Sequence, residues 1–261
     1  MTSLKVVLAA ARAMLGSDTK PIGQHHGHNH TPLLRVRTSA YGDVIVKLHR
    51  NPQRHGQEVH AYRMWAPALG DAAPQLIAVN GDPPAIAITA LPGTPLAHLN
   101  LTAAEERDAY TQAGRLLRQF HAAAPTRQRP GWCAYLASRG EQWLAKAGSR
   151  FSTTERRCIQ QHLDELASLK VETLTPCHLD FMPRNLLRAK DGTLRIIDFE
   201  HARYDLSARD LVRLTTRIWN DRPDLKNAFH STYGQQSDLD ACVIKLCTAI
   251  DNASLAASTS P

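Results

Sequence analysis

The stretch that decides the fold runs from residue 178 to residue 200 and reads HLDFMPRNLLRAKDGTLRIIDFE. Within it, Asp180 and Asn185 lie five residues apart, and Asp198 follows Asn185 by thirteen residues. The Asp-Gly pair between them is typical of a tight turn, and the run LRII predicts a short strand that ends at Asp198. The stretch therefore predicts a loop, a hairpin and a strand end that present two carboxylates and one amide.

Two acids and one amide at this spacing are what phosphoryl transfer requires. We predict that Asp180 is the catalytic base, which accepts the proton of an attacking hydroxyl and orients it toward the γ-phosphate. We predict that Asn185 and Asp198 are ligands of Mg²⁺, which neutralises charge on the phosphate oxygens. Each of these residues alone would be an ordinary loop or cap residue. The three together, after a turn and after a strand, favour the functional interpretation.

A lone lysine interrupts an otherwise apolar strand, where Lys47 follows Val44-Ile45-Val46. A lysine at a central strand position needs an anionic partner, and nucleotide phosphates would supply one. Glu58 follows eleven residues later in the next predicted helix and could hold Lys47 in place. An exposed lysine and an exposed glutamate are the alternative, which the downstream motif disfavours.

A polar segment from residue 24 to residue 31, QHHGHNHT, lies where a loop that covers phosphates belongs. It is not a G-x-G-x-x-G loop, but backbone amides around Gly27 and the side chain of Asn29 are candidate phosphate contacts. Its four histidines suggest a metal site. Their crowding along a short loop suits one tetrahedral site poorly, so a polar loop is the preferred interpretation.

Composition excludes several classes of protein. The 261 residues carry a net charge of +7 without a Lys/Arg tract, which disfavours nucleic-acid binding. No apolar run approaches the roughly 20 residues of a membrane span. The five cysteines are scattered and lack C-x-x-C spacing, so we expect reduced thiols in a cytoplasmic protein. The oligomeric state, monomer or dimer, is left open.

The pattern along the chain predicts an α+β protein. Alternating apolar runs predict an antiparallel five-stranded sheet with one helix over residues 54–68. The segment LPGTP at residues 91–95 breaks this pattern and suggests a boundary, after which helical periodicity dominates. We therefore expect an N-lobe over 1–92 that binds nucleotide. We expect a C-lobe over 93–261 that holds the catalytic loop and the acceptor site.

Together these residues resemble the aminoglycoside phosphotransferase family and its choline-kinase-like relatives. The resemblance covers nearly the whole chain, and H-x-D-x-x-x-x-N followed by I-D-F-E is its most specific part. It implies a bilobal protein-kinase-like fold with the nucleotide between the lobes and the backbone of Thr89 to Leu91 near the base. It also implies phosphorylation of a small-molecule hydroxyl by ATP or GTP. A protein kinase is disfavoured, because the short distance from Asp198 to Asp210 leaves no room for an activation segment.

The resemblance leaves the acceptor open. An antibiotic is the expected class, in resistance or in self-protection, whereas a metabolite kinase of the choline or homoserine type is the alternative. A catalytically inactive nucleotide-binding module on the same fold is a further alternative. Residues 93–261 are net positive, which suits a polycationic aminoglycoside poorly. The candidates for a local acidic patch in this region are Asp205, Asp221, Asp224 and Asp251.

Overall fold

A computed structural model describes residues 4–26 and 32–258, which form two compact units. Unit 1 comprises residues 1–100 and 183–202, and unit 2 comprises residues 101–182 and 203–261. Unit 1 includes the hairpin that follows the Asp180 loop because this hairpin pairs with the strand after residue 93. The expected functional division after residue 92 stays a prediction.

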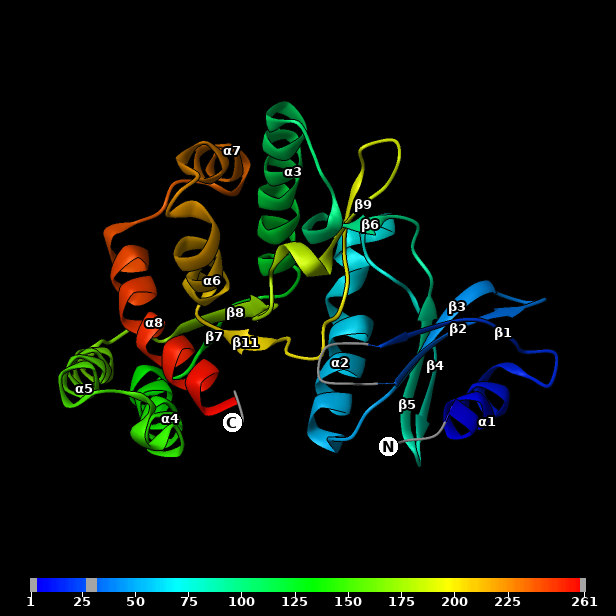
Figure 1. The fold of residues 1–261 in the computed structure, drawn as a ribbon, viewed down its shortest axis with the longest axis horizontal. Coiled ribbons are helices and arrows are strands. Elements are labelled where there is room, and N and C mark those ends of the chain that lie inside the picture. Colours follow the sequence, from blue (N-terminus) through cyan, green and yellow to red (C-terminus); the bar gives the residue numbers. More distant parts are fainter. Residues whose placement is uncertain (1–3, 27–31, 259–261) are drawn as a thin grey trace. The chain divides into compact units, whose positions relative to one another are not determined.

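Unit 1 contains the predicted antiparallel five-stranded sheet, in the order β1-β2-β3-β5-β4 (Figure 1). Helix α1 packs on one face of the sheet and helix α2 on the other. The elements of this part are α1 (Leu4–Leu15), β1 (Lys20–His26), β2 (Pro32–Thr38), β3 (Gly42–Leu48), α2 (Pro52–Met64), the 3₁₀ helix η2 (Ala66–Ala72), β4 (Leu76–Gly81) and β5 (Pro84–Thr89). The sequence-based fold class is therefore confirmed for this unit.

Strand alternation decides which side chains face each helix. Val44 and Val46 of β3 are fully buried and pack in one cluster with Val7 and Ala11 of α1. Successive side chains of a strand point to opposite faces of the sheet, so Lys47 lies on the face that α2 covers. The sheet thus directs the lysine of β3 away from the apolar α1 layer.

A second, three-stranded sheet of unit 1 has the order β10-β9-β6. Its strands are β6 (Thr94–Pro95), β9 (Leu186–Arg188) and β10 (Leu194–Ile196), with the 3₁₀ turns η3 (Leu96–His98) and η5 (Pro183–Asn185) beside them. Gly93 precedes β6 at φ +138°, and a Cβ there would lie 3.0 Å from the Cβ of Leu187. Glycine is required at this position because the chain passes so close to β9.

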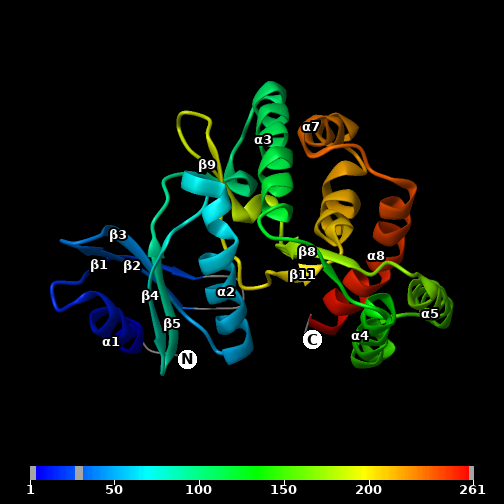
Figure 2. The same ribbon diagram turned by 180° about the vertical axis from the view of Figure 1, so that it is seen from behind.

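Unit 2 is mainly helical, and its helices α4, α5 and α8 lie side by side in both views (Figure 1 and Figure 2). Its helices are α3 (Ala103–His121), α4 (Trp132–Lys146), η4 (Gly148–Arg150), α5 (Thr153–Ser168), η6 (Ser207–Leu211), α6 (Val212–Leu214), the π-helix η7 (Thr215–Trp219), α7 (Pro223–Tyr233) and α8 (Asp238–Ser258). A small sheet in the order β11-β8-β7 joins β7 (Arg127–Gln128), β8 (Thr173–Cys177) and β11 (Arg203–Asp205). Capping boxes at Thr102 and Ser152 begin α3 and α5.

Two helix boundaries differ from the sequence-based expectation. The helix expected over 54–68 is α2, which begins two residues earlier because Asn51 caps it and Pro52 occupies its first turn. The sequence pattern of residues 207–218 also predicts one helix, and the structure has there a 3₁₀ turn, one α turn and a π turn. Among the described residues, α8 alone is long and apolar enough to cross a membrane. It packs against α4 and α5, as a core helix does.

Candidate functional site

The β9–β10 hairpin of unit 1 brings Asn185 and Asp198 to the same end of a sheet. Leu186 pairs with Ile196, and the Ile197 N–H donates a 3.0 Å hydrogen bond to the carbonyl oxygen of Asn185. Asn185 therefore lies opposite Ile197, and Asp198 is the next residue. The hairpin register thus converts a separation of thirteen residues into adjacency. Amide and carboxylate oxygens are hard ligands of the kind that Mg²⁺ prefers.

Lys47 is buried in unit 1 among three carboxylates. Its Nζ lies 2.6 Å from Oδ1 of Asp198, 3.0 Å from Oε2 of Glu58 and 2.9 Å from Oε2 of Glu200. Burial disfavours the charged ammonium, but these three acids outweigh it and raise the pKa of Lys47 well above its ordinary value. The pairing expected between Lys47 and Glu58 is present, and Lys47 also contacts the proposed metal ligand.

Glu200 is a second anchor of Lys47, and its partners come from two segments. Arg54 of α2 donates to Oε1 of Glu200 at 2.9 Å, and His201 Nε2 lies 3.3 Å from the same oxygen. Burial raises the pKa of Glu200, but the hydrogen bond from His201 and the charge of Lys47 outweigh burial and lower it. The sequence left open whether Glu200 faces a substrate or a salt bridge, and in the structure it forms the salt bridge.

Glu58 is fully buried, and nitrogen atoms of two side chains lie close to its carboxylate. Nε2 of His49 lies 3.0 Å from the same carboxylate oxygen of Glu58 that contacts Lys47. His49 stands two residues after Lys47, directly after β3 ends at Leu48, and the alternation of the strand continues to it, so both side chains lie on the α2 face. This periodicity was available in the sequence and would have identified His49 as a partner of the Lys47–Glu58 pair.

Backbone strain occurs at two points of the predicted motif. Leu179 and Asp198 have φ values of 59° and 68°, and they are the non-glycine residues with positive φ in the described part of the chain. Residues with side chains rarely adopt this conformation, and it persists where the surroundings impose it. Phe199 is fully buried and packs edge-on against Tyr62, with 5.2 Å between the ring centroids. This packing fixes the chain just after Asp198.

In unit 2, Asp180 is buried and its carboxylate is held by an arginine. Oδ1 of Asp180 accepts a 2.6 Å hydrogen bond from Nη1 of Arg213. The Asp180 N–H donates to Nδ1 of His178, 3.3 Å away, so His178 braces the loop. Arg213 was not singled out from the sequence. Its position, one helical turn after Asp210, is the signal that places it on the face toward the loop.

Asp210 anchors the loop that carries Asp180, rather than capping a helix. Its carboxylate accepts hydrogen bonds from the backbone N–H groups of His178, at 2.9 Å, and of Leu179. Its Oδ2 also lies 2.9 Å from Nε2 of His121, the last residue of α3. Asp210 therefore ties the start of the loop to two helical segments and stabilises the positive φ of Leu179.

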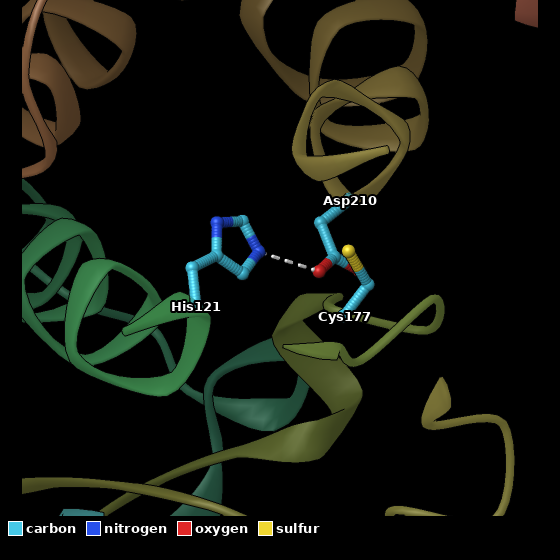
Figure 3. A group of neighbouring side chains, drawn as sticks. All are labelled: His121, Cys177 and Asp210. Carbon is cyan, nitrogen blue, oxygen red and sulfur yellow. Dashed lines mark hydrogen bonds and ion pairs between the residues drawn. The ribbon is translucent and has the colours of Figure 1, made fainter. Parts of the chain in front are cut away.

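His121, Cys177 and Asp210 lie close enough to suggest a metal site (Figure 3). Their contacts argue otherwise. The Asp210 oxygens already accept N–H groups, and the Cys177 thiol contacts the carbonyl oxygen of Asp205 at 3.4 Å. Burial raises the pKa of the Cys177 thiol well above its ordinary value, which keeps the sulfur neutral and a poor ligand. The group is a structural cluster beneath the loop.

Of the remaining residues predicted to bind nucleotide, the structure describes Thr89 and Leu91. Thr89 ends β5, where its Oγ1 accepts a 2.9 Å hydrogen bond from the N–H of Gln75, and Leu91 follows two residues later. Gly27 and Asn29 lie outside the described residues. The roles assigned to these four residues stay predictions.

Three of the four candidate acidic-patch residues are neutralised by arginines. Asp205 is fully buried and bonded to Arg203 and Arg209, and Asp224 is bonded to Arg222. Asp251 pairs with Arg213 and Arg217. Asp221 is exposed, with Asn220 as its hydrogen-bond partner at 3.4 Å. Unit 2 therefore does not assemble these acids into an unpaired acidic patch.

The protein combines an antiparallel sheet, a buried Lys47–Glu58 pair, a loop with positive φ at Leu179 and a hairpin followed by Asp198, and this combination defines a class of proteins. This class is the protein-kinase-like phosphotransferases. The chain belongs to the phosphotransferase enzyme family, whose match covers residues 24–242. A search of curated proteins returned no match.

Solved structures of the same fold cover nearly the whole chain. The macrolide 2'-phosphotransferase MphH from Brachybacterium faecium is 19% identical, with a TM-score of 0.62 over 98% of both chains. The aminoglycoside phosphotransferase APH(3'')-Id from Streptomyces rimosus, in complex with ADP and streptomycin, is 17% identical, with a TM-score of 0.64 over 97% of this chain and 99% of that one. The choline kinase LicA from Streptococcus pneumoniae is 14% identical, with a TM-score of 0.65 over 97% of this chain and 89% of that one.

At these identities the structures establish the fold. Family and fold together indicate a small-molecule phosphotransferase. The fold class expected from the sequence and the resemblance to this family are therefore confirmed.

Proposed function

We propose that the protein transfers the γ-phosphoryl group of ATP or GTP to a hydroxyl of a small molecule, with an antibiotic as the favoured acceptor class. The observation that carries this proposal is the meeting of Lys47 with Asp198 at the end of the hairpin that also presents Asn185. Membership of the phosphotransferase family supports the reaction type, and the ADP in one structural neighbour supports a nucleotide donor.

On the nucleotide side, Lys47 would bind phosphate oxygens while Glu58 holds its ammonium in place. The residues present fit Mg²⁺, because Asn185 and Asp198 supply an amide and a carboxylate oxygen at adjacent positions. When bound, Mg²⁺ would neutralise the charge that spreads over the transferring phosphoryl group. Lys47 and Asp198 contact each other in this structure. When nucleotide and metal bind, Lys47 would contact phosphate and Asp198 would contact the metal.

On the acceptor side, Asp180 would accept the proton of the attacking hydroxyl and orient its oxygen. Its burial and its bond to Arg213 keep the carboxylate in one orientation, which a positioned base requires. The arginine-paired acids of unit 2 support an acceptor of lower positive charge than a polycationic aminoglycoside. A macrolide-like, nucleoside or peptide antibiotic satisfies this condition.

The test is Mg²⁺-dependent release of ADP from ATP, or of GDP from GTP, against a panel of hydroxyl compounds. The panel contains streptomycin, a macrolide, a nucleoside antibiotic, a peptide antibiotic, choline and homoserine. We expect one class to stimulate release, and Asp180→Asn to lower the stimulated rate by about 10²- to 10⁴-fold, the usual contribution of a general base. Nucleotide binding, measured by calorimetry, should persist in Asp180→Asn.

Asp221→Asn is the matched control, because Asp221 is an exposed aspartate of the same unit. This variant should retain the wild-type rate. Stimulated release that survives in Asp180→Asn would refute the assignment of the base. Nucleotide binding without release for any acceptor would favour an inactive nucleotide-binding module.

A further inference from the structure

The carboxylate of Asp180 is the first member of a chain of alternating charges in unit 2. Arg213 of α6 donates from Nη1 to Oδ1 of Asp180, and from Nε to Oδ1 of Asp251 at 2.7 Å. Arg217 of η7 donates to the other oxygen of Asp251, which belongs to α8. Asp251 is thus shared by two arginines, of which Arg213 also reaches Asp180.

Arg213 bridges Asp180 and Asp251, and the shape of its guanidinium group fixes the direction of both hydrogen bonds. A guanidinium is planar and its N–H donors point in fixed directions. With Nε committed to Asp251 and Nη1 committed to Asp180, the plane of Arg213 is set by two attachments rather than one. A lysine ammonium in its place would be a point charge on a flexible stem and would not fix a plane.

The surroundings make the bridge effective. The side chains of Asp180 and Asp251 are 7% and 10% exposed, so water competes poorly for them. Hydrogen bonds between ionised partners are shorter and stronger than neutral ones. The backbone supports the same geometry, since Asp210 holds the N–H groups of His178 and Leu179 just before Asp180. The loop is therefore fixed through its backbone by Asp210 and through its carboxylate by Arg213.

We propose that Arg213, anchored by Asp251, is a positioning residue that orients the carboxylate of Asp180 for catalysis. The inference rests on the proposed function, in which Asp180 is the general base. It assigns to α6 and α8, which carry Arg213 and Asp251, a part in catalysis beyond the catalytic motif itself. Arg213 acts through Asp180 and makes no contact with substrate in this role.

Arg217 supplies a matched control. Both arginines bond Asp251, and Arg213 also bonds Asp180. A purely structural role would lower the activity of Arg213→Gln and Arg217→Gln only as far as each substitution unfolds the protein. A positioning role lowers the kcat of folded Arg213→Gln and leaves that of folded Arg217→Gln near wild type.

The experiment compares Arg213→Gln, Arg217→Gln and Asp180→Asn by steady-state kinetics and thermal unfolding. The reaction is hydrolysis of the Mg²⁺–nucleotide with water as acceptor, repeated with the panel compound that stimulates it most. We expect Arg213→Gln to lower kcat by about 10- to 100-fold, the scale of a misplacement near 1 Å, with little change in the KM for nucleotide. Arg217→Gln should stay within about threefold of wild type because it leaves the Asp180 bond intact.

Two further measurements distinguish positioning from general damage. Guanidinium ions added to Arg213→Ala should restore part of kcat, because they can occupy the space beside Asp180. Arg213→Gln introduced into Asp180→Asn should cause no further loss of rate, because residues that act as a unit are not additive. If Arg213→Gln matches Arg217→Gln while Asp180→Asn loses activity, the inference is overturned and the proposed function stands. If Asp180→Asn keeps its activity, the proposed function itself fails.

Discussion

Asp210 anchors the loop that carries Asp180, and its hydrogen bonds set the size of the loss expected when it is replaced. Asp210→Asn keeps the shape of the side chain but replaces one acceptor oxygen by an NH₂ donor. The buried carboxylate accepts from His178 N–H, from Leu179 N–H and from His121. A hydrogen bond to a charged group contributes about 1.5–3 kcal/mol, and a buried donor left unpaired costs about 1–3 kcal/mol. We expect a loss of about 3 kcal/mol in the free energy of unfolding at pH 7.

The pH dependence of this loss has a definite sign. Burial raises the pKa of Asp210, but the hydrogen bond and charge of His121 outweigh burial and lower the pKa below its ordinary value. A carboxyl with a lowered folded pKa contributes stability above its unfolded pKa of about 3.9 and loses it as the pH falls further. The difference between wild type and Asp210→Asn should therefore be constant from pH 7 to about pH 5 and shrink below pH 4.

The assay is urea unfolding of both proteins at pH 7, 5, 4 and 3, with kcat measured at pH 7. Asp221→Asn is the control and should lie within about 0.5 kcal/mol of wild type. Because Asp210 also holds Leu179 at a positive φ, we expect kcat to fall together with stability. A loss below about 1 kcal/mol at pH 7 would refute the account of the anchor. So would a difference that persists unchanged at pH 3.

Two other predictions concern packing and the buried lysine. Gly114→Ala should destabilise the protein by about 1–3 kcal/mol, because a Cβ there would meet the carbonyl oxygen of Phe229 at 2.2 Å. Gly56→Ala should instead stabilise the protein by about 0.5–1 kcal/mol, because Gly56 lies in helix α2 and a Cβ there would meet no atom within 4 Å. If thermal unfolding shows that both substitutions change stability in the same direction, the close contact between α3 and α7 is contradicted. Lys47→Met should cost about 3 kcal/mol at pH 7, because it leaves buried Glu58 without its ammonium partner. Urea unfolding at pH 4 should show a smaller cost, since protonation neutralises the unpaired acids, and an unchanged cost would count against the pairing.

Local features of the fold could be read from the sequence because they depend on neighbouring residues. The apolar pattern of residues 4–15 predicts a helix with the same ends as α1. The Thr102–Glu105 capping box begins α3, and the Asp-Gly turn closes the β9–β10 hairpin. The adjacency of Asn185 and Asp198 also belongs here, because a hairpin register follows from a turn and two short apolar runs.

The partners of the charged side chains were decided by the tertiary structure alone. Lys47 and Asp198 are 151 residues apart, and spacing does not show that Lys47 takes Glu200 as a third acid. Nor does it show that Arg213 reaches Asp180 and Asp251. Long polar side chains pair with whatever packing brings within about 3 Å, and packing is a property of the whole chain. The sequence therefore determined which groups are candidates for the chemistry, and the fold decided what holds them in place.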